Sequence, residues 1–322
     1  MLYTSLGRSS LRVSRICLGT MNFGPVVGTA ASHEILDLAF AAGINFIDSA
    51  DVYGSGPFGD NYGQSEEVLG EWVTTRPRDQ LVLATKVHGP MGEGPNDEGL
   101  SALHIRHAVE GSLRRMRTDY IDLYQMHHIV PGAQVDEIWE AFSVLRQQGK
   151  VLYFGSSNFP GWNIAQYQEA AQDRHLLGLV AEQSVYNLAQ RAIEQEVIPA
   201  AEHYGLGILP WSPLGGGLLA GLLQKSDRAR SAKKLDELGD ETRDRVARYE
   251  ALAGEWGLDP AELGLAWLLH QPAVTAPIVG PRTTGQIESA LRALEITLSA
   301  EQLEALDELW PGPGRAPEGY AW

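Results

Sequence analysis

The sequence predicts an α/β fold in which eight parallel strands alternate with helices and close into a single (β/α)8 TIM barrel. Two observations predict it. Short apolar runs recur along the chain at intervals of roughly thirty residues, about the length of one strand–helix repeat. Helical patterns lie between these runs, and several end at a glycine directly before the next run, as at Gly43, Gly149 and Gly205. Because periodicity alone does not show closure, a doubly wound open sheet is the second prediction.

The expected strands are rich in β-branched and aromatic residues and are bounded by Gly, Asp or Pro, as buried parallel strands are. They cover residues 15–19, 45–49, 81–87, 121–127, 151–157, 179–185, 207–212 and 276–280. The intervening helices are indicated by apolar residues at helical spacing. Examples are Ile35, Leu38, Ala39 and Ala42, and then Val135, Ile138, Trp139, Phe142 and Leu145.

Four segments supplement the repeat within one domain that spans residues 1–322. The amphipathic stretches on either side of Gly7 predict an N-terminal β-hairpin. Residues 212–240 hold no clear strand and predict a long loop, and loops of that length inside a compact domain are usually functional. Ser299 is a suitable N-cap for an extra C-terminal helix. An irregular tail rich in Pro, Gly and aromatic residues follows at 310–322.

The composition narrows the class of function. The formal net charge of −16 disfavours binding to nucleic acid or to anionic membranes. The only cysteine, Cys17, excludes an intrachain disulfide and fits a reducing compartment. The first residues lack the layout of a signal peptide, and no apolar stretch approaches membrane-spanning length. We expect a cytoplasmic protein, and its oligomeric state stays open.

A glycine motif in the stretch "GINFIDSADVYGSGPFG" is misleading. The spacing G-x-G-x-x-G over residues 54–59 is that of Rossmann dinucleotide-binding folds. In those folds the glycines join a strand to a helix N-terminus, whereas here the helical pattern starts only near Ser65 and Pro57 interrupts the motif. The next strand carries Lys86 where a ribose-binding acid is needed. We therefore interpret these glycines as a loop over the barrel mouth.

Polar residues stand where the apolar runs end. In a barrel of this kind the C-terminal strand ends and the loops after them build the active site. The residues at these positions are Asp48 and Tyr53, Lys86, His127, Ser157 and Asn158, Gln183, and Trp211 and Ser212. Each has a plain structural alternative, such as a turn cap, a solvated lysine or a loop anchor, so the inference rests on their joint arrangement.

The chemistry of this group suits a carbonyl that gains negative charge. A free tyrosine has a pKa of about 10, and a buried ammonium nearby is expected to lower it. Asp48 can hold Lys86 by an ion pair, and His127 can orient the substrate oxygen or relay a proton. His127 and His128 should alternate in direction along the strand, so that only one faces the mouth, and the register favours His127.

Six blocks in this order resemble the aldo-keto reductases: "GINFIDSADVYG", "LVLATKV", "DYIDLYQMH", "GSSNF", "WSPLGGG" and "GPRTTGQIE". The likeness runs from "ICLGTMNFG" to the final helix. The resemblance implies a barrel that binds NADP(H) across its mouth without a Rossmann domain. It also implies a catalytic tetrad of Asp48, Tyr53, Lys86 and His127, with Tyr53 as general acid.

The cofactor pocket is carried over from the same resemblance. It implies contacts from Gly19 and Thr20 to the nicotinamide-side ribose, from Ser157, Asn158 and Gln183 to the carboxamide, and from Trp211 to the nicotinamide ring. It further implies contacts from Ser212, Leu214, Gly215 and Gly217 to the pyrophosphate, from Arg282 to the 2′-phosphate, and from Gly280 and Gln286 to the adenosine phosphate. The walls of the substrate pocket are expected to include Phe23, His88 and His128. The basic residues Lys225, Arg228, Arg230, Lys233 and Lys234 in the long loop either assist the pyrophosphate or are solvated.

Two positions depart from the family pattern. Family members often have Asn where this chain has Ala290, which leaves the strength of any preference for NADP over NAD open. Many have Trp after the tetrad histidine, where this chain has His128, and this changes the pocket wall.

The sequence therefore predicts an enzyme that reduces aldehydes or ketones with NADPH and binds no metal. Two alternatives stay open. One is a regulatory subunit that binds NADP(H) and turns over very slowly, because the sequence also resembles potassium-channel beta subunits. The other is a barrel metallohydrolase using His127, His128 and Asp48, which is disfavoured by the cation Lys86 in the same place. The physiological substrate and the shapes of the loops at 88–100 and 212–240 stay undetermined.

Overall fold

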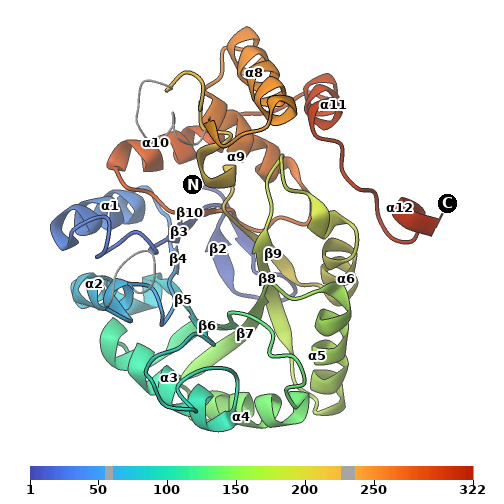
Figure 1. Cartoon of the computed structure of the whole chain (residues 1–322). Coiled ribbons are helices and arrows are strands. Elements are labelled where there is room, and N and C mark those ends of the chain that lie inside the picture. Colours follow the sequence, from blue (N-terminus) through green and yellow to red (C-terminus); the bar gives the residue numbers. More distant parts are fainter. Residues whose placement is uncertain (55–60, 226–235, 322) are drawn as a thin grey trace.

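The computed structural model describes residues 1–54, 61–225 and 236–321 and shows a barrel seen nearly along its axis in Figure 1, with strands inside and helices outside. The central sheet has the strand order β10-β3-β4-β5-β6-β7-β8-β9, and its pairings are parallel. Its strands are β3 (Cys17–Gly19), β4 (Phe46–Asp48), β5 (Val82–Val87), β6 (Ile121–Met126), β7 (Val151–Ser157), β8 (Leu179–Val185), β9 (Gly207–Trp211) and β10 (Ile278–Val279).

The two ends of this sheet meet. Just before β10, Val274 forms a parallel bridge with Ile208 of β9, and the Thr275 amide donates a 2.9 Å hydrogen bond to the Ile208 carbonyl. The barrel prediction is thus confirmed, and the prediction of an open doubly wound sheet is wrong.

The helices that cover the strands are α1 (Thr29–Ala41), α2 (Gln64–Val73), α3 (Ala102–Met116), α4 (Val135–Gln147), α5 (Gly161–Asp173), α6 (Val197–Tyr204), α8 (Asp240–Glu255), α9 (Pro260–His270) and α10 (Thr284–Ala293). As the sequence predicts, Gly43, Gly149 and Gly205 have positive φ angles where a helix ends. Among the described residues between β9 and β10, α8 precedes α9, and α8 is an addition that the strand–helix repeat does not predict.

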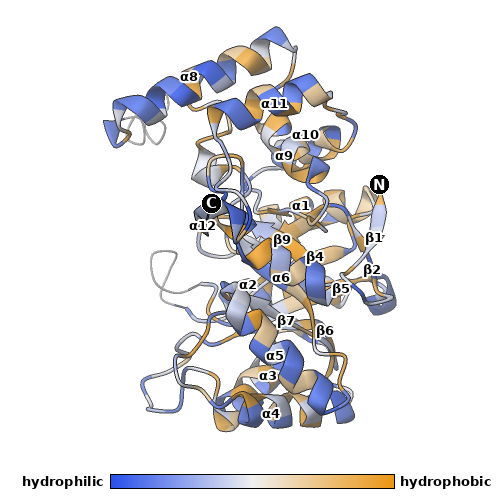
Figure 2. Cartoon of the chain, turned by 90° about the vertical axis from the view of Figure 1, so that its right-hand side faces the viewer, coloured by the Kyte–Doolittle hydropathy of each residue, from blue (hydrophilic) through white to orange (hydrophobic). Residues whose placement is uncertain are grey.

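The N-terminal hairpin closes one end of the barrel. Strands β1 (Tyr3–Ser5) and β2 (Arg12–Ser14) pair antiparallel, and Leu6 and Val13 are fully buried against inward-facing residues such as Phe46 and Leu123. Figure 2 places this hairpin at the edge of the barrel, away from the loops that follow the strands. The opposite end is left for the polar residues at the strand ends.

The remaining elements follow the prediction in part. Helix α11 (Ala300–Leu309) begins with a capping box in which Ser299 accepts from Gln302, as expected of its N-cap. The predicted long loop contains a short 3-10 turn, η4 (Gly215–Gly217). The tail, predicted to be irregular, includes the short helix α12 (Glu318–Ala321). No helix among the described residues is both long and apolar enough to cross a membrane.

Candidate active site

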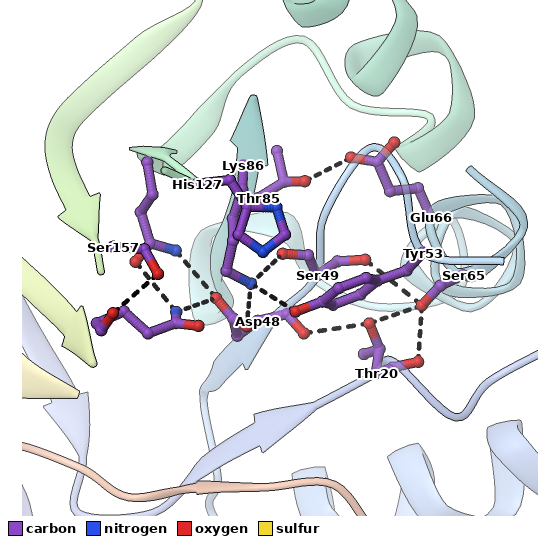
Figure 3. Close-up of polar contacts among 12 residues, drawn as sticks. Thr20, Asp48, Ser49, Tyr53, Ser65, Glu66, Thr85, Lys86, His127 and Ser157 are labelled. Atoms are coloured by element: carbon purple, nitrogen blue, oxygen red, sulfur yellow. Dashed lines mark hydrogen bonds and ion pairs between the residues drawn. The ribbon is translucent and has the colours of Figure 1, made fainter. Parts of the chain in front are cut away.

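The buried Lys86 contacts two other predicted catalytic residues, Asp48 and Tyr53, at one end of the barrel (Figure 3). Lys86 Nζ lies 2.6 Å from Asp48 Oδ2, 2.7 Å from the Ser49 carbonyl and 3.1 Å from Tyr53 Oη. These contacts account for the three ammonium protons of a side chain that is fully buried. Adjacent parallel strands supply the pair, since Asp48 ends β4 and Lys86 lies near the end of β5.

Asp48 is held by amides as well as by the lysine. Its Oδ1 accepts hydrogen bonds of 2.9 Å from Gln125 Nε2 and 3.0 Å from Gln183 Nε2. Gln183 Nε2 also lies 3.1 Å from Gln125 Oε1, so the two amides are themselves connected. Gln125 is absent from the sequence-based set, although its place on the barrel-facing side of β6, two residues before His127, is a signal that could have found it.

Tyr53 keeps its own proton in this arrangement. The ammonium of Lys86 donates to the phenol oxygen and lies 4.8 Å from the ring centroid, which leaves the phenol O–H to point elsewhere. Burial raises the pKa of Tyr53, Lys86 lowers it, Asp48 raises it, and the net pKa is above the usual value. The expected lowering by the ammonium is present, but burial and the carboxylate outweigh it. The phenol is in its acid form at neutral pH.

Burial and neighbouring charges determine the pKa values of Lys86 and His127. The pKa of Lys86 is raised: burial lowers it, but Asp48 and Tyr53 outweigh that effect. Burial, and then the positive charge of Lys86, hold the pKa of His127 well below its usual range. His127 is thus a neutral imidazole, which can donate one N–H to a substrate oxygen but does not carry a spare proton.

The two histidines do not alternate across the sheet. Strand β6 ends at Met126, before either residue, and the rings of His127 and His128 stack 5.0 Å apart at 11°. The His127 ring also stands edge-on to Tyr53 at 6.0 Å, and the His88 ring lies 5.4 Å from that of His128. The expected alternation is therefore wrong, because it applies only within a strand, and the three imidazoles form one wall beside Tyr53.

Other predicted pocket residues are less accessible. Phe23 is fully buried in the main apolar core, so in this arrangement it offers no surface to a substrate. Thr20 is also fully buried, and its hydroxyl is engaged with the Asp48 carbonyl and with Ser65. Gly19 packs tightly, because a Cβ there would lie 2.8 Å from a side-chain atom of Ile278.

The residues expected around the nicotinamide form a connected group. Asn158 Nδ2 lies 3.0 Å from Ser157 Oγ and 3.1 Å from the His127 carbonyl. Its Oδ1 accepts a 3.0 Å hydrogen bond from Trp211 Nε1. Because the Trp211 side chain is fixed by this bond and the residue is 38% exposed, it presents an aromatic surface to solvent.

A turn rich in exposed backbone follows Trp211. Ser212 and the glycines at 215–217 all have φ angles between 53° and 98°, and Leu214 packs against the core from below. A Cβ on Gly217 would meet no described atom within 4 Å, so there is space beside this residue. The amides of the turn bond within it: Gly215 and Gly217 donate to the Ser212 and Leu214 carbonyls, and Gly216 donates to Ser212 Oγ.

The last predicted contacts lie at the start of α10. Arg282 and Gln286 are exposed there, and the Arg282 amide donates a 2.6 Å hydrogen bond to Gln286 Oε1. Nearby, the Gly280 carbonyl accepts from Asn22 Nδ2, while the buried Asn22 Oδ1 has no partner among the described atoms. Ala290 faces the core rather than this surface.

Several predictions fall partly outside the described residues. Gly56, Gly59, Arg228, Arg230, Lys233 and Lys234 lie there. Gly54 is described, and its carbonyl accepts from the Asn61 amide inside a loop, whereas α2 begins at Gln64. In the described chain, no group of three His, Cys, Asp or Glu side chains is placed to hold a metal ion. The geometry thus lends no support to the metallohydrolase alternative.

Fold and site together define a (β/α)8 barrel in which a buried lysine joins a carboxylate to a tyrosine at the mouth. Comparison with known proteins specifies the class further. The profile described as "Aldo/keto reductase family" matches residues 15–311, and the chain belongs to this family. Membership makes it an oxidoreductase of carbonyl groups in general, and nicotinamide cofactors serve this family.

Three relatives illustrate the range of the family. The chain is 46% identical to "Uncharacterized oxidoreductase YrpG" of Bacillus subtilis, over the whole of both chains. It is 32% identical to "Probable voltage-gated potassium channel subunit beta" of Oryza sativa, over 99% of this chain and 100% of the relative. It is 33% identical to "Norsolorinic acid reductase stcV" of Emericella nidulans, over 94% of this chain and 80% of the relative.

Proposed function

We propose that this protein reduces aldehydes or ketones to alcohols with NADPH, and that Tyr53 is the general acid. One observation carries the proposal: Lys86 donates to Tyr53 Oη while Asp48 compensates the buried ammonium. When bound, the nicotinamide supplies the hydride for the carbonyl carbon. The chain's own task is then to bind the carbonyl oxygen and to protonate it as negative charge develops.

The roles of the side chains follow from their contacts. The Tyr53 O–H bond breaks and a new O–H bond forms on the substrate oxygen. The resulting phenolate is stabilised by Lys86, 3.1 Å away. Neutral His127 donates a hydrogen bond to the same oxygen and so fixes the carbonyl against Tyr53. Asp48 touches neither substrate nor cofactor in this scheme and positions Lys86.

The residues of the mouth fit a dinucleotide. The aromatic surface of Trp211 suits the nicotinamide ring, and Ser157, Asn158 and Gln183 offer polar groups for its carboxamide. The space beside Gly217, in the left-handed turn after Trp211, suits a close approach of the pyrophosphate. Arg282 suits the 2′-phosphate, because its guanidinium is a planar fork of donors with a permanent charge.

The test follows the loss of NADPH absorbance with 4-nitrobenzaldehyde. Tyr53→Phe keeps the ring and removes the proton, and it should lower kcat by about a hundredfold to ten-thousandfold. Tyr124→Phe is the matched control, because that buried hydroxyl has no partner among the described atoms and lies outside the proposed site. Unchanged turnover in Tyr53→Phe would refute the assignment of the acid.

A redox-sensing regulatory subunit is the second candidate, favoured by the 32% identity to the rice relative. It shares the cofactor site but predicts tight NADPH binding with very slow turnover. If the wild type quenches NADPH fluorescence at micromolar concentration yet reduces none of a panel of aliphatic and aromatic carbonyls, this second candidate replaces the first.

A further inference from the structure

We propose that Glu182 is a positioning residue for the cofactor site: its carboxylate holds the segment that carries Asn158, and cofactor binding weakens when that carboxylate is protonated. The inference rests on the proposed function, because it assigns a control over the same nicotinamide cofactor. Glu182 belongs to β8 and precedes Gln183, so the two side chains leave the strand on opposite faces. Gln183 faces Asp48 in the site, and Glu182 faces the rear of the β7–α5 segment.

The carboxylate of Glu182 is a fully buried acceptor for donors from two strands and a loop. Its Oε2 lies 2.5 Å from Ser156 Oγ of β7, and its Oε1 lies 2.6 Å from Ser184 Oγ of β8. The same Oε1 accepts a 3.1 Å hydrogen bond from the Phe159 amide. The Asn158 amide, which donates a 3.0 Å hydrogen bond to the Gln183 carbonyl, also lowers the pKa of the Glu182 carboxylate.

Hydrogen bonds hold the chain on both sides of Asn158. Behind it, Glu182 holds the neighbouring residues Ser156 and Phe159. In front, the Asn158 side chain connects the His127 carbonyl to the Trp211 indole. Asn158 itself has a φ of 59°, a left-handed conformation that a non-glycine residue keeps only when its surroundings hold it. Relaxing the rear anchor should therefore disturb the surface offered to the nicotinamide.

Protonation changes what Glu182 can do. An ionised carboxylate only accepts hydrogen bonds, which matches the two hydroxyls and the Phe159 amide, whereas a protonated carboxyl must donate one. Burial raises its pKa to about 7, while the donors from Ser156, Ser184 and the loop amides oppose the rise. The hydrogen-bond partners that the described chain gives it are all neutral, so no counter-charge fixes its ionised state. The switch thus falls near neutral pH.

The test measures the Kd of NADPH by fluorescence between pH 6 and pH 8 for the wild type, Glu182→Gln and Asp122→Asn. Asp122 is the matched control, because it is another buried carboxyl with a raised pKa, at the far end of β6 beside Arg78. We expect the wild-type Kd to rise as the pH falls, by at most about tenfold per unit since one proton is coupled. Glu182→Gln should flatten this rise, and Asp122→Asn should keep it.

The outcomes separate this inference from the proposed function. A wild type that binds neither NADPH nor NADH overturns both. A wild type that binds NADPH with a flat profile, or a Glu182→Gln variant that keeps the wild-type profile, overturns the inference alone. If Glu182→Gln does not fold, Ser184→Ala replaces it: losing one donor to the carboxylate should move the midpoint of the profile to higher pH. An unmoved midpoint then overturns the inference.

Discussion

The Lys86 ammonium and the Asp48 carboxylate form an ion pair of 2.6 Å in which the side chains are 0% and 2% exposed. Removing two charges from water costs several kcal/mol each, and the pair is sustained only if every remaining polar atom is satisfied. Here the other lysine protons reach Ser49 and Tyr53, and the second carboxylate oxygen accepts from two glutamine amides. The pair is therefore compensated as a unit, and neither charge is tolerable alone.

A double-mutant cycle should reveal that unit. Asp48→Asn and Lys86→Met, made singly, are each expected to lower the free energy of unfolding by about 3–5 kcal/mol, because each strands a buried charge. The double variant should recover most of the loss and stay inactive. Urea unfolding of the four proteins measures the coupling. The exposed pair Arg245–Glu241 is the control, with an expected coupling of about 0.5 kcal/mol or less. Additive losses at Asp48 and Lys86 would contradict the prediction.

The pH at which the reaction rate falls on the alkaline side should depend on the Lys86–Asp48 pair. Reduction needs a protonated Tyr53, so its rate falls as the pH rises through that pKa, which burial and Asp48 raise above 10.0. In Asp48→Asn the negative charge that raises the pKa of both Tyr53 and Lys86 is gone, so the pair loses its first proton at lower pH. In a profile of kcat/KM measured from neutral pH to about pH 11, the fall in rate should occur at lower pH in Asp48→Asn than in the wild type. A fall that stays in place or moves to higher pH would refute this account.

How far the site could be predicted depended on strand periodicity. Asp48, Lys86 and Gln183 follow apolar runs whose carboxyl ends must meet in a barrel, so the sequence places them together. The prediction that His127 and His128 point in opposite directions was wrong, because side chains alternate only within a strand and β6 ends at Met126. Loop geometry beyond a strand is set by tertiary contacts that no local pattern contains.

Burial was the second limit. The pattern of residues around Tyr53 suggests an ammonium that lowers its pKa, yet the net direction depends on how much water the folded chain excludes. The role of Glu182 could not be predicted, because a single carboxyl inside an apolar run forms no motif and its donors come from β7 and the following loop. Thr20, placed in the cofactor pocket by family resemblance, and Phe23, expected in the wall of the substrate pocket, are both fully buried here.

Arg282 should determine the preference between the two nicotinamide cofactors. If its guanidinium binds the 2′-phosphate, Arg282→Ala should raise the Kd of NADPH about tenfold to a hundredfold and leave that of NADH nearly unchanged. Titration of both cofactors by fluorescence measures the ratio. Arg292→Ala serves as control, since that side chain lies in the last turn of the same helix and pairs with Glu262. An equal loss for both cofactors would place the 2′-phosphate elsewhere.

The glycine turn after β9 should lie against the pyrophosphate, which can approach it closely at Gly217. Gly217 has a φ of 98° and open space at its Cβ position, so Gly217→Ala strains the backbone and adds a methyl group over the turn. We expect weaker NADPH binding and a stability loss of about 1 kcal/mol. Gly257→Ala is matched, with a φ of 67° and equally open space after α8, and should lose stability alone. Equal NADPH affinity in both variants would argue against a phosphate site here.

The raised pKa of Glu182 also predicts how stability depends on pH. Its pKa rises from 4.5 in the unfolded chain to about 7, so the native state holds more protons in this window. The contribution of Glu182 to the free energy of unfolding is therefore full below pH 4.5 and is lost as the pH rises through 7. Glu182→Gln lacks this loss, and its unfolding free energy relative to the wild type should improve by about 3 kcal/mol between pH 4 and pH 8. Urea unfolding across this range measures the difference.

Asp37→Asn, the control, should show the opposite sign. Burial raises the pKa of Asp37, but hydrogen bonds from Trp72 and Arg76 outweigh it, so the stabilisation from Asp37 is lost as the pH falls. A relative stability of Glu182→Gln that does not change with pH would contradict the titration of Glu182 on which its control of the cofactor site depends.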